Sequence, residues 1–399
     1  MVASRRVGDS NPIVVYGLST EGYQIASSLA MNHAPTILVD ERLQVATEVG
    51  QETVSTYSSA RELIEEESLL GIRPIDVTIS ETDAVFFTPK IRRPGDEAKK
   101  EWSSMLSSIS KNISKGTIIF SCLPVGFGIN SEMIEIVERA SGLQAWEEFT
   151  YVYLPLLPRT RSAITFGMEK NDLVEKAKEI LRLAQIKHPK NLTLLLSEIN
   201  YLREILGNYP QRVIELEVYK SVRDFKLRRE LSKFTKADVP YLDVLADGLH
   251  DIKNIVSSLQ SGEPSLYIAS GVLRGIEGYA RYLTDELKAL MKEKELKASR
   301  TDVTLGWNLD RFEIRGEKIL LRELLIERIG DLVGDVGSPV GVEYGASSEK
   351  VARMPSLGGD KIHLLIICSK SDEDLLTGLD SRTLRGIVTL KANLICDRS

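Results

Sequence analysis

Residues 14 to 30 read "VVYGLSTEGYQIASSLA" and decide the fold that we expect at the start of this chain. An apolar run enters a turn at Gly17, and a helical pattern begins near Thr20. Gly17, Ser19 and Gly22 occupy the three glycine positions of the G-x-G-x-x-G pattern, with serine at the middle one. The first glycine makes the tight turn, and the third lets the helix pack closely on the strand. The stretch therefore predicts a dinucleotide-binding strand-turn-helix unit.

Two residues bear on the ligand of this turn. The middle glycine normally lets the backbone approach a pyrophosphate, so Ser19 adds a side chain where space is scarce, or its hydroxyl bonds a phosphate. Asp40 ends the run "TILVD", where a carboxylate accepts hydrogen bonds from ribose hydroxyls and repels the additional phosphate of NADP. The sequence predicts NAD as the cofactor. The alternative is that the glycine turn and the aspartate have only a structural role.

The composition is that of a globular protein without membrane spans. Hydrophobic residues make up 43% and charged residues 27% of the 399, and no apolar run reaches the roughly 20 residues that a transmembrane helix needs. Cys122, Cys368 and Cys396 are far apart without C-x-x-C spacing, which argues against disulfides and a zinc site. The N-terminal segment has no signal-peptide pattern, and the net charge of -6 gives no global attraction to nucleic acid. We expect a cytoplasmic protein without a metal or a membrane partner.

Short apolar runs alternate with helical patterns over the first part of the chain. The runs are "PIVVYG", "TILVD", "AVFFTP", "GTIIFSC", "FTYVYLP" and "AITFG". Strands joined by helices in this way form a parallel sheet, whose ligands lie at the carboxyl ends of the strands. We expect the α/β fold class, with a Rossmann domain containing a doubly wound parallel sheet over residues 1–168.

The rest of the chain divides into two expected parts. Residues 169–298 predict a helical connector, in which Pro210 kinks a long helix or separates two, and residues 197–235 are expected to form a homodimer contact. Residues 299–399 predict a small C-terminal α/β domain. In it "DRFEIRGEKILL" is interpreted as two short strands, "LLRELLIERIGDLVG" as a helix, residues 334–359 as a loop, and "KIHLLIICS" and "GIVTLKANLIC" as strands.

Longer stretches of the chain resemble a known family. "KGTIIFSCLPVGFGINSEMIEIVERASGLQAWEEFTYVYLPLLP" is similar to the UDP-glucose and UDP-N-acetylmannosamine dehydrogenases, in which a strand leads to an S-T-V-P-P-G-T turn, a helix, "SGL" and a strand ending in S-P-E-R. Upstream, "TDAVFFTPKIRRPGDEA" is similar to that family's fourth strand and V-P-T-P loop. The resemblance covers residues 11 to about 220. It implies an N-terminal NAD domain, a long central helix that makes a dimer, and a C-terminal domain that binds a UDP-sugar.

The resemblance also implies which further residues line the cofactor. They lie in the loop and the turn that match the family's motifs, and they are Thr88, Pro89, Ser121 and Cys122. Together with Gly17, Ser19, Thr20, Gly22 and Asp40 they form the expected cofactor site, for which a dinucleotide or a nucleotide-sugar is the expected ligand.

The chain departs from the family where its chemistry is carried. The family oxidises an alcohol twice, through a cysteine thiohemiacetal and thioester, assisted by a glutamate, a lysine and an asparagine. This chain has Leu156 at the glutamate position and Glu204 at the lysine position, while Asn208 is in register with the asparagine. The family's G-F-G-G-x-C loop has no counterpart. We therefore expect the four-electron oxidation to be lost.

Few candidates remain for catalysis or for binding phosphate. Cys122 replaces the family's threonine near the nicotinamide and is either a relocated nucleophile or a packing residue, and Asn208 is the other weak catalytic candidate. Arg92 and Arg93 follow the fourth strand, where they either meet a phosphate or lie in a solvated loop.

One basic stretch, "KSVRDFKLRRELSKFTK", raises the question of nucleic acid. Such a helical face can bind phosphates by releasing counterions, but more often it is a solvated face that pairs with nearby acids. Its basic residues are Lys220, Arg223, Lys226, Arg228, Arg229, Lys233 and Lys236, with Phe225 and Phe234 between them.

Three functions follow from the sequence. The favoured one is an NAD-binding protein, related to nucleotide-sugar dehydrogenases, that has lost the four-electron reaction and has a sensing or regulatory role. The alternative is a two-electron NAD-dependent dehydrogenase with other catalytic residues. The weaker alternative is a nucleic-acid-binding module that uses residues 220–236.

Overall fold

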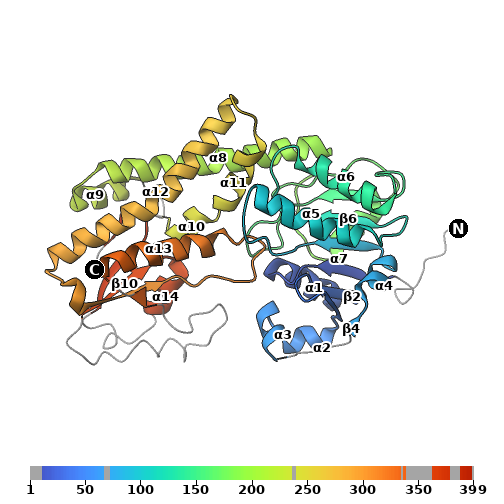
Figure 1. Ribbon diagram of the computed structural model, residues 1–399, viewed down its shortest axis with the longest axis horizontal. Helices are drawn as coiled ribbons and strands as arrows, with labels where there is room; N and C mark the ends of the chain where they lie inside the picture. Colours follow the sequence, from blue (N-terminus) through green and yellow to red (C-terminus); the bar gives the residue numbers. More distant parts are fainter. Residues whose placement is uncertain are drawn as a thin grey trace. The chain divides into compact units, whose positions relative to one another are not determined.

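The computed structural model describes residues 11–66, 72–235, 240–333, 336–337, 362–377 and 387–397. The chain forms two compact units, and Figure 1 labels many of their elements. The first unit comprises Met1–Ile205, Lys253–Leu266 and Phe312–Gly316. The second comprises Leu206–Ile252, Tyr267–Arg311 and Glu317–Ser399.

A seven-stranded sheet forms the centre of the first unit, in the order β4-β3-β2-β1-β5-β6-β7. The parallel strands are β1 (Ile13–Tyr16), β2 (Thr36–Asp40), β5 (Ala84–Phe87), β6 (Ile118–Ser121) and β7 (Thr150–Tyr153). Their residues are almost all buried, as expected of strands covered by helices on both faces. The expected Rossmann-type sheet is confirmed. It is extended beyond β2 by β3 (Val45–Glu48), which pairs antiparallel with β2, and by β4 (Ile72–Arg73), which pairs antiparallel with β3.

The helices of the first unit, apart from α2, bury residues on one face. They are α1 (Thr20–Met31), α2 (Gln51–Thr56), α3 (Ala60–Glu66), α4 (Ile75–Ser80), α5 (Asp96–Ser110), α6 (Ile129–Ser141) and α7 (Val174–Leu183). Helix α5 buries Trp102, Leu106 and Ile109, which recur at helical spacing, and it packs beside α6 (Figure 1). The expected strand "AITFG" forms only isolated bridges, such as Leu156 with Ala163, so that prediction is wrong as to a regular strand.

The central region is helical, as expected. It contains α8 (Leu194–Ser221), α9 (Phe225–Thr235), α10 (Leu242–Ala246), α11 (Leu249–Ser258) and α12 (Pro264–Glu293). Pro210 lies inside α8 and does not divide it into two helices. Among the described residues, no helix combines the length and the apolarity needed to cross a membrane.

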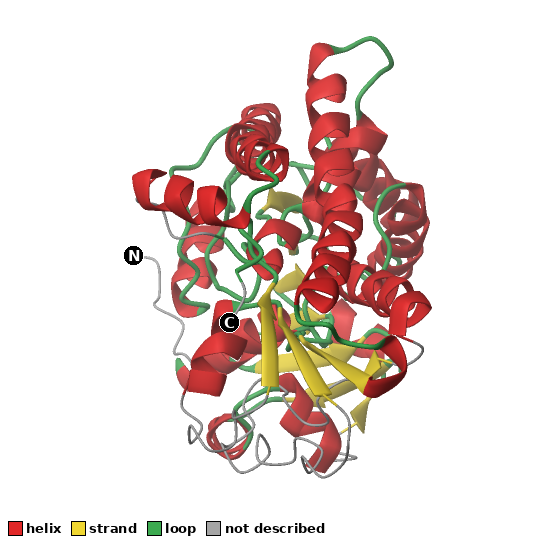
Figure 2. Cartoon of the chain, turned by 90° about the vertical axis from the view of Figure 1, so that its left-hand side faces the viewer, coloured by secondary structure: helices red, strands yellow, loops and turns green. Residues whose placement is uncertain are grey.

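The second unit contains a four-stranded parallel sheet in the order β11-β10-β8-β9, whose strands are seen among helices in Figure 2. The strands are β8 (Thr301–Gly306), β9 (Val336–Gly337), β10 (Ile362–Ile367) and β11 (Ile387–Lys391). Two helices, α13 (Glu317–Val333) and α14 (Lys370–Thr377), follow β8 and β10 in the chain. The expected small α/β domain is confirmed as to its class.

Two local expectations in this region are wrong. "DRFEIRGEKILL" does not form two strands, because residues up to Gly316 form turns with an isolated bridge between Ile91 and Arg315, and α13 begins at Glu317. Leu321 and Leu325 are buried at helical spacing in α13. This spacing is hard to see in the sequence, because apolar neighbours in "EKILL" stand beside Leu321. Residues 334–359, expected to be a loop, lie outside the described residues except for β9.

Candidate functional site

The turn between β1 and α1 is held by contacts that only glycine permits. Gly17 has φ of +127°, and a Cβ atom there would lie 2.2 Å from the carbonyl oxygen of Thr88. A Cβ atom on Gly22 would lie 2.4 Å from the Gly17 carbonyl oxygen and 2.6 Å from Thr88 Oγ1. Thr88 Oγ1 in turn donates to the Gly17 carbonyl at 3.2 Å. The backbone nitrogen of Pro89 is also close, at 2.4 Å from the position of a Cβ atom on Gly17. The structure thus brings together four of the residues expected at the cofactor site.

Ser19 caps α1 rather than facing an open loop. Its backbone is extended, and its Oγ accepts a hydrogen bond from Gly22 N–H at 3.0 Å. The side chain is fully buried. Serine is a preferred N-cap because it satisfies a backbone donor that the helix leaves free. The hydroxyl at the middle position of the pattern therefore serves the helix itself.

Two neighbouring backbone donors at this helix terminus are bonded by other parts of the chain. Leu18 N–H donates to Glu41 Oε2 at 2.9 Å, and Thr20 N–H donates to the carbonyl oxygen of Phe312 at 2.8 Å. The N-terminus of a helix is where a dinucleotide-binding fold receives its pyrophosphate. The described conformation does not fit a pyrophosphate at these two donors, because a carboxylate and a carbonyl already accept their hydrogen bonds.

Glu41 forms a buried ion pair with Lys90. Its Oε1 lies 3.5 Å from Lys90 Nζ and accepts from Lys90 N–H at 3.2 Å. The side chains are 1% and 5% exposed. Burial lowers the pKa of the Lys90 ammonium, and the neighbouring Glu41 carboxylate acts in the opposite direction. The ammonium also lies 5.3 Å from the centre of the Phe312 ring.

A second carboxylate, Glu21, is fully buried in the first turn of α1. It accepts from the backbone N–H groups of Arg159 at 2.9 Å and Ile314 at 3.0 Å. Burial raises the pKa of the Glu21 carboxyl, and these hydrogen bonds lower it in part. Because Ile91 N–H donates to Ile314 O at 2.8 Å, the segment Phe312–Gly316 is fastened at several points of this site.

Asp40 lies at the end of β2, as expected, and its side chain accepts hydrogen bonds from the backbone of the turn that follows. Its Oδ1 accepts from Arg42 N–H at 2.8 Å and Leu43 N–H at 3.0 Å. Arg93 forms an exposed ion pair with Glu97 at 3.0 Å. A ribose-binding role of Asp40 stays a prediction.

Cys122 and Leu156 lie together at the carboxyl end of β6, beside Ser121. Both side chains are fully buried, and Leu156 N–H donates to Cys122 O at 3.4 Å. Burial raises the pKa of the Cys122 thiol, and the nearby Glu21 carboxylate raises it further. Arg315 donates to the Leu156 carbonyl at 2.8 Å. The position that the resemblance assigns to a proton-transferring glutamate is therefore apolar and enclosed.

The remaining candidates do not provide an accessible thiol. Cys368 and Cys396 are fully buried, and burial raises the pKa of both thiols, that of Cys396 to about 12. Glu204 forms an ion pair with Arg203 at 2.7 Å. Asn208 lies exposed on α8 in the second unit.

The second unit gathers polar groups at the carboxyl edge of its own sheet. Lys318 Nζ lies 2.9 Å from Asp243 Oδ1, which also accepts from Trp307 Nε1 at 3.0 Å. Asp372 accepts from Ser369 Oγ at 2.5 Å, and burial raises the pKa of its carboxyl. The strand order reverses between β8 and β10, and open α/β sheets bind ligands at such a point. None of these residues was singled out from the sequence.

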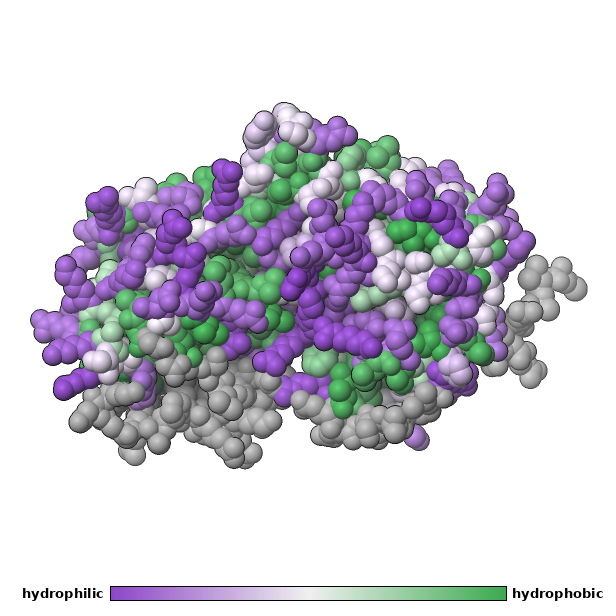
Figure 3. Space-filling model, in the orientation of Figure 1, coloured by the Kyte–Doolittle hydropathy of each residue, from purple (hydrophilic) through white to green (hydrophobic). Residues whose placement is uncertain are grey.

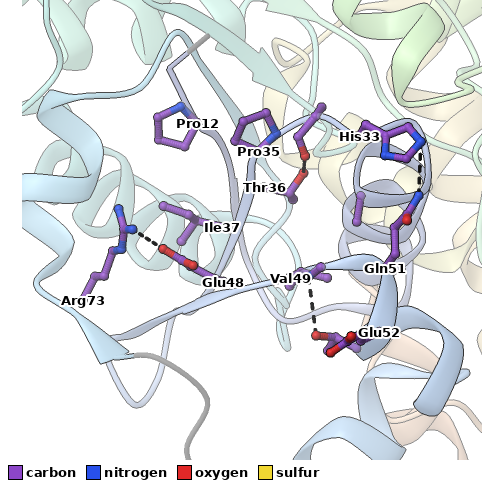
Figure 4. A pocket seen from close by; sticks show the side chains of 14 residues that line it. Pro12, His33, Pro35, Thr36, Ile37, Glu48, Val49, Gln51, Glu52 and Arg73 are labelled. Carbon is purple, nitrogen blue, oxygen red and sulfur yellow. Dashed lines mark hydrogen bonds and ion pairs between the residues drawn. The ribbon is translucent and has the colours of Figure 1, made fainter. Parts of the chain in front are cut away.

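An open pocket of about 610 Å³ lies at the opposite edge of the first sheet (Figure 4). Pro12 and Thr36 line it at the amino ends of β1 and β2, with His33 beside Gln51 at 3.4 Å. Ligands of open parallel sheets bind at the carboxyl edge, so this pocket is not the expected cofactor crevice. Within the described residues, no group of three or more His, Cys, Asp and Glu side chains is arranged to hold a metal ion.

The basic stretch pairs in part with acids. Lys220 contacts Glu217 at 2.6 Å and Lys233 contacts Glu230 at 2.9 Å, both within one helix turn. Arg228 is 1% exposed and bonds Glu286 at 2.8 Å, so it is unavailable to a phosphate. Lys236 lies outside the described residues, and so does the side chain of Phe234.

Sequence reasoning missed the residues that close the turn. Glu41 lies outside the quoted stretches, and Glu21, Lys90 and Phe312 lie at positions within them to which no role was assigned. Their contacts join positions as far apart as Glu21 and Ile314, which are 293 residues apart. The one signal in the sequence was a pair of carboxylates near the glycine turn, Glu21 and Glu41, because acidic side chains are unfavourable beside a bound phosphate.

Known structures share this fold. The chain is similar to UDP-D-ManNAc dehydrogenase from Pyrococcus horikoshii, with a TM-score of 0.64 and 14% identity over 97% of this chain and 96% of that one. It is also similar to UDP-glucose dehydrogenase from Pyrobaculum islandicum, with a TM-score of 0.62 and 15% identity over 98% and 96%. UDP-N-acetylmannosamine dehydrogenase from Staphylococcus aureus gives a TM-score of 0.63 and 13% identity over 97% and 96%. No protein-family model and no curated protein matches the sequence. The resemblance seen in the sequence is thus confirmed along the whole chain at the level of the fold, which this chain shares with these nucleotide-sugar dehydrogenases.

Proposed function

We propose that this protein keeps the dinucleotide-binding frame of the nucleotide-sugar dehydrogenases without their four-electron oxidation, and that it has a sensing or regulatory role. The observation that carries the proposal is the burial of all three thiols of the chain. Cys122, Cys368 and Cys396 are each 0% exposed, and burial raises the pKa of each.

The chemistry explains why buried thiols exclude that reaction. A thiohemiacetal forms when a thiolate attacks the aldehyde, so the nucleophile must be both ionised and accessible. Cys122 is neither, and the Glu21 carboxylate beside it opposes ionisation further. Leu156 occupies the position of the family's proton-transferring glutamate and cannot move a proton. Hydrolysis of a thioester would need both groups.

NAD is the ligand that we propose for the turn between β1 and α1. The close contacts of Gly17 and Gly22 with Thr88 support a retained dinucleotide frame. Asp40 at the end of β2 favours NAD over NADP, because a carboxylate repels the phosphate on the ribose. Titration calorimetry with both dinucleotides tests this. NAD is expected to bind more tightly than NADP, and a preference for NADP would contradict the assignment.

The alternative two-electron dehydrogenase makes a different prediction in one assay. The protein is mixed with NAD and a panel of alcohols, and absorbance is followed at the NADH band. We expect no turnover. Formation of one NADH for each alcohol consumed would favour the dehydrogenase, since a single hydride transfer needs no thiol.

A further inference from the structure

We infer that Glu41 is a built-in anion that holds the place of a dinucleotide pyrophosphate, so that a dinucleotide binds only by displacing this carboxylate. The inference rests on the proposed function, because it describes how that same site is regulated. It is carried by the hydrogen bond from Leu18 N–H to Glu41 Oε2 at 2.9 Å and by the ion pair of Glu41 with Lys90.

Free N–H groups and the helix dipole make the start of α1 attractive to negative charge. Glu41 brings such a charge from within the chain to the turn that leads into this helix. Its two oxygens accept from Leu18 N–H, one residue before the N-cap Ser19, and from Lys90 N–H. Its side chain is 1% exposed, so the carboxylate is buried beside these donors and does not lie in solvent.

Lys90 Nζ lies 3.5 Å from Glu41 and is itself buried. A buried ammonium needs a compensating anion, because loss of the anion would leave the ammonium as an unpaired buried charge. A pyrophosphate that replaces Glu41 would satisfy the same ammonium. The site is therefore built for the exchange of one anion for another, with Lys90 as the common partner.

While Glu41 occupies this position, a pyrophosphate meets a carboxylate in a buried environment, where like charges repel strongly. The Phe312 carbonyl in addition accepts the Thr20 N–H hydrogen bond. The apparent affinity for a dinucleotide is the intrinsic affinity multiplied by the fraction of molecules whose site is open, so it is low when few sites are open.

The experiment compares Glu41→Gln with the unaltered protein in calorimetric titrations with NAD. Glutamine keeps the size of the side chain but removes its charge, which leaves Lys90 for the phosphate. We expect NAD to bind at least about tenfold more tightly. Glu48→Gln is the matched control, because Glu48 is an exposed carboxylate of the same unit that pairs with Arg73 and lies in β3 rather than at the start of α1. It should leave the affinity for NAD unchanged.

A second variant covers the case in which Glu41→Gln does not fold. Glu41→Asp keeps a charge near Lys90 but shortens the side chain and withdraws it from Leu18 N–H, so NAD should again bind more tightly. Unchanged or weaker NAD binding in the folded variants overturns the inference. If the unaltered protein binds NAD as tightly as the Glu41 variants do, the proposed function stands although the inference fails. If neither protein nor variant binds NAD or NADP, the proposed dinucleotide function fails as well.

Discussion

The backbone N–H of Leu156 donates a hydrogen bond to the carbonyl oxygen of Cys122 at 3.4 Å, and neither side chain reaches solvent. The pair joins the two positions at which a relocated nucleophile and its acid-base partner would have to act. One is a thiol whose pKa is raised by burial, and the other is a leucine. The carboxyl end of β6 is therefore packed as part of the core.

The thiols should be inert in the native protein. At pH 8 we expect a disulfide thiol reagent such as DTNB to label the folded chain slowly and the denaturant-unfolded chain rapidly, because reaction requires an accessible thiolate. The absorbance of the released thiolate measures both rates. Rapid labelling of one thiol in the folded state would identify a reactive cysteine that the structure does not show.

Alkaline pH should destabilise the fold through the same thiols. Burial raises the pKa of Cys396 from its ordinary value of 9.0 to about 12. Between these values the unfolded chain has lost a proton that the folded chain retains, so the free energy of unfolding falls as pH rises above 9.0. One such thiol contributes about 1.4 kcal/mol per pH unit in that window. Denaturant unfolding at several pH values should show a smaller slope for Cys396→Ala, and an unchanged slope would contradict the shift.

Gly22→Ala should destabilise the first unit. Its Cβ atom would lie 2.4 Å from the Gly17 carbonyl oxygen, so the helix must move off the strand, at a cost of about 1–3 kcal/mol or more. Gly271→Ala in α12 is the control, since no atom lies within 4 Å of the new Cβ, and it should stabilise by about 0.5–1 kcal/mol. Urea unfolding measures both. Equal stability of the two variants would refute the close packing at the turn.

We propose that α8 forms a homodimer contact. It exposes apolar side chains one turn apart, Ile214 at 63% and Val218 at 47%, whereas hydrophilic side chains cover most of the face seen in Figure 3. We expect light scattering at tens of micromolar to give a dimer, and Ile214→Glu to give a monomer. Asn208→Glu adds the same charge at an exposed position of α8 that lies about 120° around the helix from Ile214, and it is the control. A monomeric unaltered protein would reject the proposal.

Local signals were enough to predict the frame of the site but not its contents. Gly17 and Gly22 follow from spacing, because a tight turn and close helix packing are requirements of the backbone. The Glu41 and Phe312 contacts arise from tertiary packing, on which periodicity has no bearing. The segment before α13 was misread because "FEIR" alternates like a strand while its backbone pairs with Ile91 only at one bridge.

The fate of a UDP-sugar tests the central claim most directly. The protein is incubated with NAD and UDP-glucose, UDP-galactose or UDP-N-acetylmannosamine, and absorbance is followed at the NADH band, with Cys122→Ser measured in parallel. Because no thiol is accessible and Leu156 replaces the base, we predict that no NADH forms with any of the three. Two NADH for each sugar, abolished in Cys122→Ser, would show that the nucleophile has moved to Cys122 and that the four-electron oxidation is retained.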